Sequence, residues 1–306
     1  MADSLSSGGS FRKEVRVQIP PPAPAMPSLD SKSNIIYPIF LILVGLTASF
    51  VYMRTRNGIR LELPFFTKTE VAKPILPPAA PAKAKIPVLV YHYVEVVQNK
   101  NDFIRRSLAI TPAAFESHIK SLVEDGYTFY FVRDISDVLT ASKAAKAVVL
   151  TFDDGYGDFY TDAFPILKKY NVKSTVFINS GLINQPNYMT KPQVLELAKS
   201  GIVELGGHGY SHLNLVQVEK ALATTTVETD REKLKTDYGV TAVSFCYPYG
   251  AYNATIQQIV KNAGYTYGVT LDPGWILSTD NLLAIPRVKP GAAGTGSLAE
   301  YLNSLN

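Results

Sequence analysis

The 306-residue sequence is poor in cysteine and in charge. It has one cysteine, Cys246, so an intramolecular disulfide and a cysteine-based zinc site are both excluded. Charged residues make up only 18% of the chain and hydrophobic residues 46%. This composition excludes a disordered acidic or basic tail protein and a membrane protein with many spans, and the length suffices for one sizeable domain with additional segments.

The excess of positive charge is confined to the first part of the chain. Residues 1–86 carry 11 Lys and Arg against 5 Asp and Glu, whereas residues 87–306 carry 19 against 21, a net charge of −2. A nucleic-acid-binding domain needs a basic folded face. We therefore expect no nucleic-acid partner.

Residues 35–53, IIYPIFLILVGLTASFVYM, contain no charged side chain. At about 1.5 Å of rise per residue, a helix of this length just crosses a hydrocarbon layer of ~30 Å. A buried helix is disfavoured by the basic residues on both sides, and a cleaved signal peptide by the lack of a clear cleavage sequence. We expect an uncleaved single transmembrane anchor, although Arg54 and Arg56 after it would favour a cytoplasmic C-terminal side.

The segments around this span have the composition of disordered chain. Residues 1–34 begin rich in Ser and Gly, and VQIP at residues 17–20 is what a translated tRNA gene would yield, so we hypothesise that the chain starts at Met26. Residues 54–86 are rich in Pro, Ala and Lys, a composition that favours extended polyproline II. We expect a disordered segment at 1–34, a linker at 54–86 and a folded domain at 87–306.

Within residues 87–306, short apolar runs alternate with helix-period segments. The predicted strands lie at 88–93, 147–152, 173–178, 202–205, 243–246, 266–270 and 283–288, and the predicted helices at 111–124, 158–170, 191–200, 215–238 and 255–263. This alternation predicts an α/β fold with a parallel sheet. The number of strands suggests a closed or nearly closed barrel, with a doubly wound open sheet as the alternative. In both, chemistry takes place at the carboxyl ends of strands.

Two adjacent carboxylates follow the predicted strand at 147–152, in the sequence TFDDGY. Asp153 and Asp154 are neighbours on an extended segment, so their side chains point in different directions and can take different roles. One can bind a metal ion while the other acts on a water molecule that the ion holds. The alternative is an ordinary turn, because Asp-Gly is a common turn pair.

Two of the four histidines lie four residues apart after the predicted strand at 202–205. They are His208 and His212 in GGHGYSH, and this spacing allows both to bind one ion. Unrelated surface or core histidines are the alternative. Together with Asp154 they form a set of two histidines and one carboxylate, which leaves positions on the ion for water and substrate, as hydrolysis requires.

Two turns follow further predicted strands. Tyr249 lies in the PYG sequence at 248–250, whose backbone N–H groups could face a developing negative charge. Asp272 and Trp275 lie in the DPGW sequence that follows the strand at 266–270. A bare turn and a core tryptophan are the simpler interpretations when each is taken alone.

In this order, TFDDG, HxxxH, PYG and DxxW resemble the motifs of the polysaccharide deacetylases with the NodB homology domain, carbohydrate esterase family four. The resemblance covers most of residues 87–306. It implies a distorted (β/α) barrel that removes acetyl groups from sugar polymers with a divalent metal ion, usually zinc. It implies these roles: catalytic base, Asp153; metal ligands, Asp154, His208 and His212; oxyanion and substrate contact, Tyr249; sugar site, Asp272 and Trp275.

The sequence departs from the family pattern at two positions. Cys246 stands where the family usually has an arginine before the PYG sequence, and no histidine occurs in the last motif, IPRV at 285–288. The histidine His92 follows the first predicted strand of the domain, a placement that resembles the branch containing the extracellular poly-N-acetylglucosamine deacetylases. We expect His92 to act as the general acid and Arg287 to orient Asp153, whereas His118 lies in an amphipathic helix and is expected to be structural.

The resemblance implies a metal-dependent hydrolase that removes N-acetyl groups from an N-acetylglucosamine-containing polysaccharide of the cell envelope. Because such polymers lie outside the cytoplasm, we expect the anchored domain to be extracytoplasmic. A non-catalytic glycan-binding protein on a degenerate barrel remains an alternative, as does a metal-dependent hydrolase of a small amide.

Overall fold

The computed structural model describes residues 82–290 and 297–305. The expected disordered segment at 1–34, the anchor at 35–53 and nearly all of the 54–86 linker lie outside these residues. Within the described ranges, no helix is both long and apolar enough to cross a membrane.

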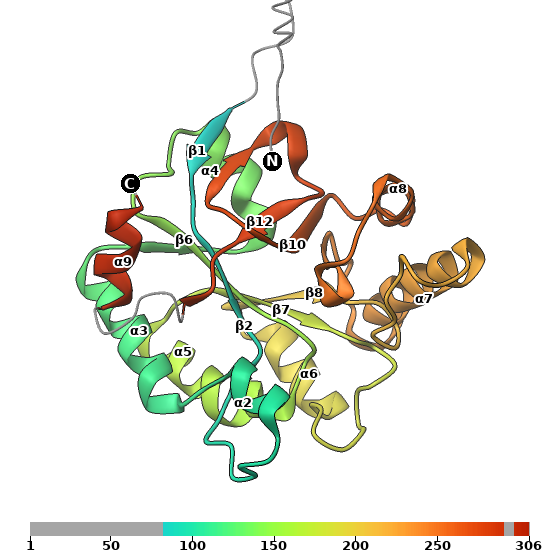
Figure 1. Cartoon of the computed structure of the whole chain (residues 1–306), viewed down its shortest axis with the longest axis horizontal. Coiled ribbons are helices and arrows are strands. Elements are labelled where there is room, and N and C mark those ends of the chain that lie inside the picture. The colour runs from blue at the N-terminus through green and yellow to red at the C-terminus, as the bar shows by residue number, and fades with distance from the viewer. Residues whose placement is uncertain (1–81, 291–296, 306) are drawn as a thin grey trace, which may run out of the picture. The chain divides into compact units, whose positions relative to one another are not determined.

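Parallel strands form the centre of the domain (Figure 1). They are β2 (Val88–Tyr91), β5 (Thr128–Tyr130), β6 (Ala147–Phe152), β7 (Ser174–Ile178), β8 (Val203–Gly207), β9 (Ser244–Cys246), β10 (Tyr267–Pro273) and β12 (Ile285–Arg287). The sheet runs in the order β12-β10-β9-β8-β7-β6-β2, with β5 also paired to β6. A parallel bridge between Leu89 and Val288 joins the two ends of this path. The sheet is therefore a nearly closed barrel, as expected, and not an open sheet.

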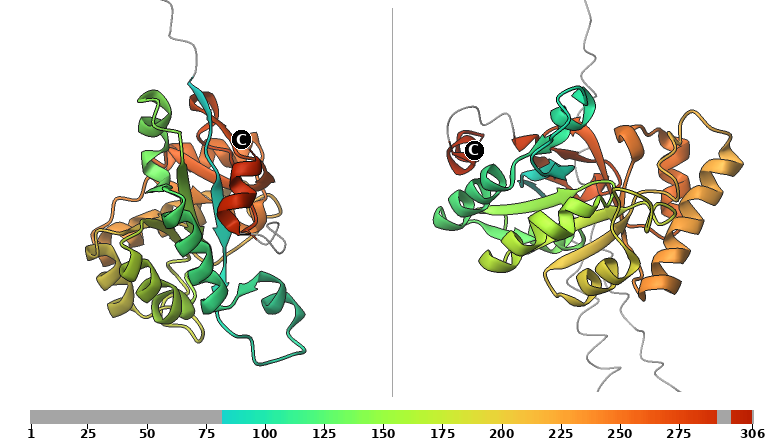
Figure 2. Two further views of the ribbon diagram at one scale, coloured as in Figure 1. Left: turned by 90° about the vertical axis from the view of Figure 1, so that its left-hand side faces the viewer. Right: turned by 90° about the horizontal axis from the view of Figure 1, so that it is seen from below.

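Helices cover the outside of the barrel in all three views (Figures 1 and 2). They are α2 (Phe103–Leu108), α3 (Pro112–Glu124), α4 (Ile135–Thr140), α5 (Phe164–Tyr170), α6 (Lys191–Lys199), α7 (Lys220–Tyr238), α8 (Ala254–Asn262) and α9 (Leu298–Ser304). The start of α3 shows why the sequence predicts it. Thr111 caps this helix by accepting a hydrogen bond from the Ala114 N–H at 3.2 Å, and Pro112 occupies the first turn.

Side chains of each strand alternate between the interior of the barrel and the helices outside it. In β6, Val148, Leu150 and Phe152 pack in the same cluster as helix residues of α3, whereas Ala147 and Val149 pack with residues from the other strands. Asp153 continues the inward series just past the end of β6. The alternation thus delivers this carboxylate to the interior of the barrel at its carboxyl end.

Several elements differ from the sequence-based expectation. The strand β1 (Lys83–Lys85) pairs antiparallel with β11 (Ile276–Ser278), so ordered structure begins inside the expected 54–86 linker. A second short pair joins β3 (Tyr93–Val94) to β4 (Ala109–Ile110). The strand β5 was not expected, because TFY at 128–130 is too short for its pattern to stand out.

Candidate active site

The three expected metal ligands lie together at the carboxyl end of the barrel. Asp154 Oδ1 lies 3.2 Å from His208 Nε2 and 3.1 Å from His212 Nε2. One donor atom from each residue falls within 4.8 Å of the others. His208 is buried, whereas the side chain of His212 is 26% exposed, so the group opens toward solvent on one side.

The donor set of these three residues fits a divalent metal ion. Two imidazole nitrogens and one carboxylate oxygen are ligands that suit zinc and leave coordination positions open. His208 Nδ1 lies 2.7 Å from the Cys246 carbonyl oxygen, a contact that holds Nε2 toward Asp154. Burial by itself would raise the pKa of Asp154, but hydrogen bonds from the two histidines hold it well below its usual range.

Three site residues have backbone conformations that are uncommon outside glycine. The φ angles are +74° for Asp154, +56° for His212 and +61° for Tyr249. A left-handed conformation costs a non-glycine residue free energy, and such residues cluster at functional sites where the surrounding structure holds them. Five other described non-glycine residues, among them Ser142 and Lys146, also have positive φ, so this conformation accompanies the three motifs but does not single them out.

Asp153 is paired with Arg287 inside the barrel. Arg287 Nη1 and Nη2 donate to Asp153 Oδ1 and Oδ2, each at 2.7 Å. Arg287 also donates to the Thr270 carbonyl oxygen at 2.6 Å and to Thr151 Oγ1 at 3.0 Å. Burial would raise the pKa of Asp153, but the charge and hydrogen bonds of Arg287 outweigh it and leave that pKa below its usual value. The carboxylate is thus ionised and oriented.

Cys246 explains how Arg287 reaches this position. Its thiol is buried and lies 3.4 Å from Arg287 Nη2. The side chain of cysteine is small, so the interior has room for a guanidinium that arrives from β12. The arginine missing before the PYG sequence thus has a spatial counterpart on another strand.

His92 lies beside the same carboxylate. Its Nε2 is 3.7 Å from Asp153 Oδ2, and its side chain is 17% exposed. Burial lowers the pKa of His92 more than the charges of Asp153 and Asp154 raise it. His92 also lines a cavity of about 250 Å³ together with Leu108 and Lys289. His118 of α3 lines the same cavity, and its Nδ1 lies 3.2 Å from the phenol oxygen of Tyr91.

Tyr249 lies at the rim of the metal-ligand group. Its side chain is exposed, and its ring centroid is 4.6 Å from that of His212. The following Gly250 has φ +67°, and a Cβ there would lie 2.6 Å from the Cβ of Leu271. The PYG turn therefore requires its glycine to pack against β10 next to the site.

Trp275 is not brought to the site, contrary to expectation. Its carbonyl oxygen accepts a hydrogen bond from the Ile86 N–H at 2.7 Å, and its Nε1 donates to the Leu305 carbonyl oxygen at 3.1 Å. Ile86 precedes β2, whereas His92 follows it, so the two lie at opposite ends of that strand. Asp272 accepts a hydrogen bond from Tyr252 at 2.7 Å on the exposed side of β10 and does not join the metal-ligand group.

A row of tyrosines that the motifs did not reveal lies beside Asp154. The rings of Tyr93 and Tyr156 stack with centroids 4.0 Å apart, and Tyr188 follows at 5.1 Å from Tyr156. Burial raises the pKa of Tyr93 to about 12, and the charge of Asp154 adds to the rise for all three. Tyr156 could have been suspected from its place in TFDDGY, but nothing in the sequence pointed to Tyr188.

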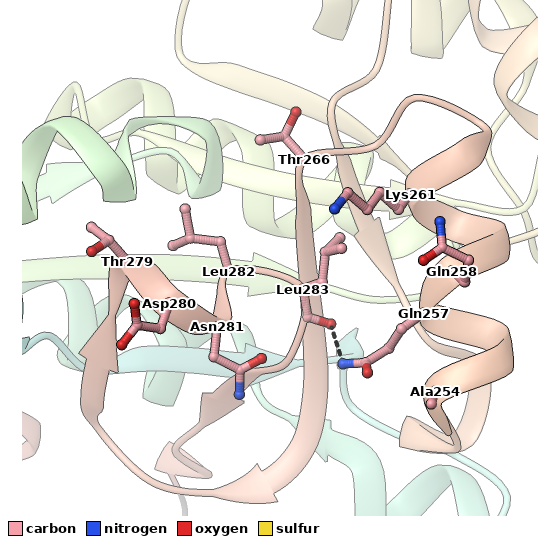
Figure 3. Close-up of a pocket in the computed structure, with 10 residues that line it drawn as sticks. All are labelled: Ala254, Gln257, Gln258, Lys261, Thr266, Thr279, Asp280, Asn281, Leu282 and Leu283. Carbon is pink, nitrogen blue, oxygen red and sulfur yellow. Dashed lines mark hydrogen bonds between the residues drawn. The ribbon is translucent and has the colours of Figure 1, made fainter. Parts of the chain in front are cut away.

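A larger cavity, of about 490 Å³, lies away from these residues (Figure 3). It is formed between α8 and residues 279–283, where Gln257 Nε2 donates to the Leu283 carbonyl oxygen at 3.4 Å. The described residues that line it include none of the expected site residues. Cavity size alone would therefore have pointed to the wrong place.

The chain is similar to known polysaccharide deacetylases. The family model described as "Polysaccharide deacetylase" matches residues 140–268. "Putative polysaccharide deacetylase YxkH" of Bacillus subtilis (strain 168) is 31% identical over 226 residues, which cover 72% of this chain and 77% of that protein. The poly-beta-1,6-N-acetyl-D-glucosamine N-deacetylase of Staphylococcus aureus (strain MRSA252) is 28% identical over 222 residues, 65% of this chain and 77% of that protein.

Solved structures show the same fold. The Streptococcus pyogenes deacetylase PplD, solved in complex with acetate, has a TM-score of 0.64 at 29% identity and covers 73% of this chain and 99% of its own. The IcaB structure from Ammonifex degensii has a TM-score of 0.60 at 24% identity, with 67% and 91% covered. The second likeness concerns the fold alone.

Proposed function

The chain belongs to the polysaccharide deacetylase family, and from this membership we propose that it removes N-acetyl groups from an N-acetylglucosamine-containing polysaccharide of the cell envelope. The observation that carries the proposal is the division of work between two adjacent carboxylates. Asp154 faces His208 and His212, whereas Asp153 is held ionised by Arg287. A relative that acts on poly-N-acetylglucosamine supports the class of substrate.

Asp154, His208 and His212 would hold a divalent metal ion, zinc in this proposal. Such an ion, when bound, supplies a Lewis acid that acidifies water and polarises the acetyl carbonyl. Asp153 accepts the proton of the attacking water, and Arg287 keeps the carboxylate ionised for this task. The Tyr249 N–H donates to the acetyl oxygen as negative charge develops there.

His92 donates a proton to the leaving amide nitrogen, which is a poor leaving group without one. Its lowered pKa makes the ring neutral at pH 7, so it must gain the proton during the reaction. Asp153, 3.7 Å away, is the source: the proton taken from water passes to His92 and then to nitrogen. One water and one amide thus yield a free amine and acetic acid, which releases a proton to become acetate.

The row of tyrosines takes the place that the sequence analysis gave to Trp275. Tyr93, Tyr156 and Tyr188 present hydroxyl groups in the field of Asp154. Phenol hydroxyls can donate to and accept from sugar hydroxyls and the acetamido group. We assign the sugar-facing wall of the site to these three residues.

Both reasons for the non-catalytic alternative are weakened by residues beside Asp153. It was favoured by the missing arginine and the missing late histidine, but Arg287 now supplies the guanidinium beside Asp153. His92 stands within 3.7 Å of the same carboxylate. Hydrolysis of a small amide uses the same chemistry and is separated from the proposal only by substrate.

We also propose that the domain is anchored by residues 35–53 and acts outside the cytoplasm. The support is the charge-free span in the sequence and the location of acetylated envelope polymers. A membrane-impermeant label applied to intact cells should reach the domain. Labelling only after lysis would contradict this location.

The test of the function is acetate release by the full-length protein from N-acetylglucosamine oligomers, metal-stripped and then reconstituted with zinc. We expect release only with zinc. His92→Ala should lower the rate by about 10²-fold or more, whereas His118→Ala, the same change in the histidine of α3, should retain it. Zinc binding without release from any oligomer would contradict the proposal, and release from a soluble amide alone would favour the small-amide alternative.

A further inference from the structure

A buried carboxylate outside the motifs holds the loop that carries His208. Asp230 belongs to α7 and is fully buried. Its Oδ2 accepts hydrogen bonds from the His208 and Gly209 N–H groups, each at 3.0 Å. Its Oδ1 accepts from the Ser180 N–H, also at 3.0 Å. One side chain therefore binds three backbone donors at the carboxyl ends of β7 and β8.

A buried amide holds the same loop from the carbonyl side. Asn179 follows β7 and is fully buried. Its Nδ2 donates to the carbonyl oxygens of His208 and Gly209, at 2.6 Å and 2.9 Å. The peptide group between His208 and Gly209 is thus bound at its oxygen by Asn179 and at its N–H by Asp230.

The glycines around His208 make this arrangement both possible and necessary. A Cβ at Gly207 would overlap the Tyr265 phenol oxygen and lie 2.7 Å from Asp230 Oδ2, so only glycine admits both groups. Gly209 has φ +75°, a conformation that glycine adopts without steric cost but that its own backbone does not restrict. Contacts from other elements therefore fix this segment: besides those of Asp230 and Asn179, the His208 N–H donates to the Ile178 carbonyl oxygen at 3.1 Å, and His208 Nδ1 lies 2.7 Å from the Cys246 carbonyl oxygen.

We propose that Asp230 and Asn179 are positioning residues that set the metal affinity of the site by fixing the His208–Gly209 peptide. The proposal rests on the metal site of the proposed function. Contacts of this kind, one step removed from the ligands, change metal affinity by about 10–100-fold when lost. Neither residue touches substrate or the reacting atoms in this assignment.

The test is zinc affinity of the metal-stripped full-length protein, measured by competition with a chromophoric chelator. Asp230→Asn leaves one acceptor oxygen for three donors, and Asn179→Ala removes both amide donors. Each should weaken zinc binding by about 10–100-fold. The control is Glu204→Gln, the same change at a buried carboxylate that contacts Thr175 and Ser244 but not the ligand loop.

Cobalt substitution adds a spectroscopic readout. The visible absorption of bound Co²⁺ should change in Asp230→Asn and Asn179→Ala and stay unchanged in Glu204→Gln. Thermal unfolding of each metal-free variant identifies any that does not fold. If either Asp230→Asn or Asn179→Ala fails to fold, the zinc affinity of the other variant tests the proposal. Wild-type zinc affinity in the folded variants would overturn the positioning role alone. Absence of zinc binding by the wild-type protein would overturn the metal site itself, and with it the positioning role of Asp230 and Asn179.

Discussion

Two carboxylates are buried inside the same barrel, and their surroundings move their pKa values in opposite directions. Asp153, past the carboxyl end of β6, is bound by the Arg287 guanidinium, which lowers its pKa against the effect of burial. Glu204, near the amino end of β8, accepts from Thr175 at 2.8 Å and from Ser244 at 2.7 Å. There burial prevails, and the pKa of Glu204 is raised.

Under the proposed function, this difference separates a reactive carboxylate from a structural one. Hydroxyl donors satisfy the hydrogen-bonding capacity of a buried acid but do not replace the charge stabilisation it had in water. A buried cation replaces that charge stabilisation. The carboxyl end of the barrel therefore holds a carboxylate whose pKa is lowered, whereas the amino end holds one whose pKa is raised.

The largest effect should come from His212→Ala. It removes a metal ligand while leaving both buried carboxylates in place. Loss of the Lewis acid and of the activated water, each worth several kcal/mol, predicts a fall in deacetylation of about 10⁴-fold or more. Zinc content by mass spectrometry and acetate release would check it. Full activity without bound zinc would show that the carboxyl end does not work as proposed.

The next effect should come from Asp153→Asn, which removes the base but keeps the ligand set. We expect a loss of about 10²–10⁴-fold in rate with zinc still bound. Glu204→Gln, the same acid-to-amide change at the other end of the barrel, is the matched control and should deacetylate normally. An Asp153→Asn protein with the wild-type rate would rule out the base assignment.

Replacing Arg287 should give Asp153 a raised pKa, like that of Glu204. In Arg287→Met, burial of Asp153 is no longer offset, so its pKa rises above the usual value. The base is then protonated at higher pH, and the acidic limb of the rate profile moves upward in pH. An unpaired buried charge also costs about 3–5 kcal/mol in the free energy of unfolding.

The contribution of Asp153 to the free energy of unfolding should change with pH in opposite directions in the wild-type protein and in Arg287→Met. Because the folded-state pKa of Asp153 is depressed, its contribution is present above the ordinary aspartate pKa and is lost as pH falls through the folded value. Urea unfolding from neutral pH downward would measure both proteins. An unchanged pH–rate profile in Arg287→Met would show that the guanidinium does not control Asp153.

The smallest effect should come from Glu204→Gln. Since the pKa of Glu204 is raised, the folded state binds more protons than the unfolded state, and this residue costs the wild-type protein stability as pH rises through that window. The free energy of unfolding of the variant should differ from that of the wild type by about 1 kcal/mol or less at neutral pH. As pH falls, the wild type should become more stable relative to the variant. Urea midpoints at several pH values would show this, and a gap that widens in the other direction would contradict the raised pKa.

The sequence predicted much of this domain because its signals are local. The strand at 147–152 is confirmed residue for residue as β6, and the cap of α3 lies where Thr111 predicted it. The helix expected at 215–238 begins only at Lys220, since the residues before it form turns. Motifs that follow strands also placed Asp154, His208 and His212 together correctly.

Trp275 shows where such reasoning ends. Its position in DPGW after a strand matched the family pattern, but the chain turns there into β11, which pairs with β1 from residues 83–85. That pairing joins segments nearly two hundred residues apart and turns the tryptophan away from the site. No local pattern predicts it, because the free energy comes from a contact with distant chain.

Which residues face the interior could be predicted from the amino-acid sequence, because strand alternation and the residues that follow each strand are local properties. The same local signals led to the proposed metal ligands, the proposed base and an arginine on the last strand. The three-dimensional fold determines that β12 closes against β2, which brings Arg287 to Asp153 across 134 positions of sequence. It also decided that Asp230, on a helix, binds the His208 loop. Both depend on barrel closure and packing, since the charges involved are stabilised only where distant segments meet in the absence of water.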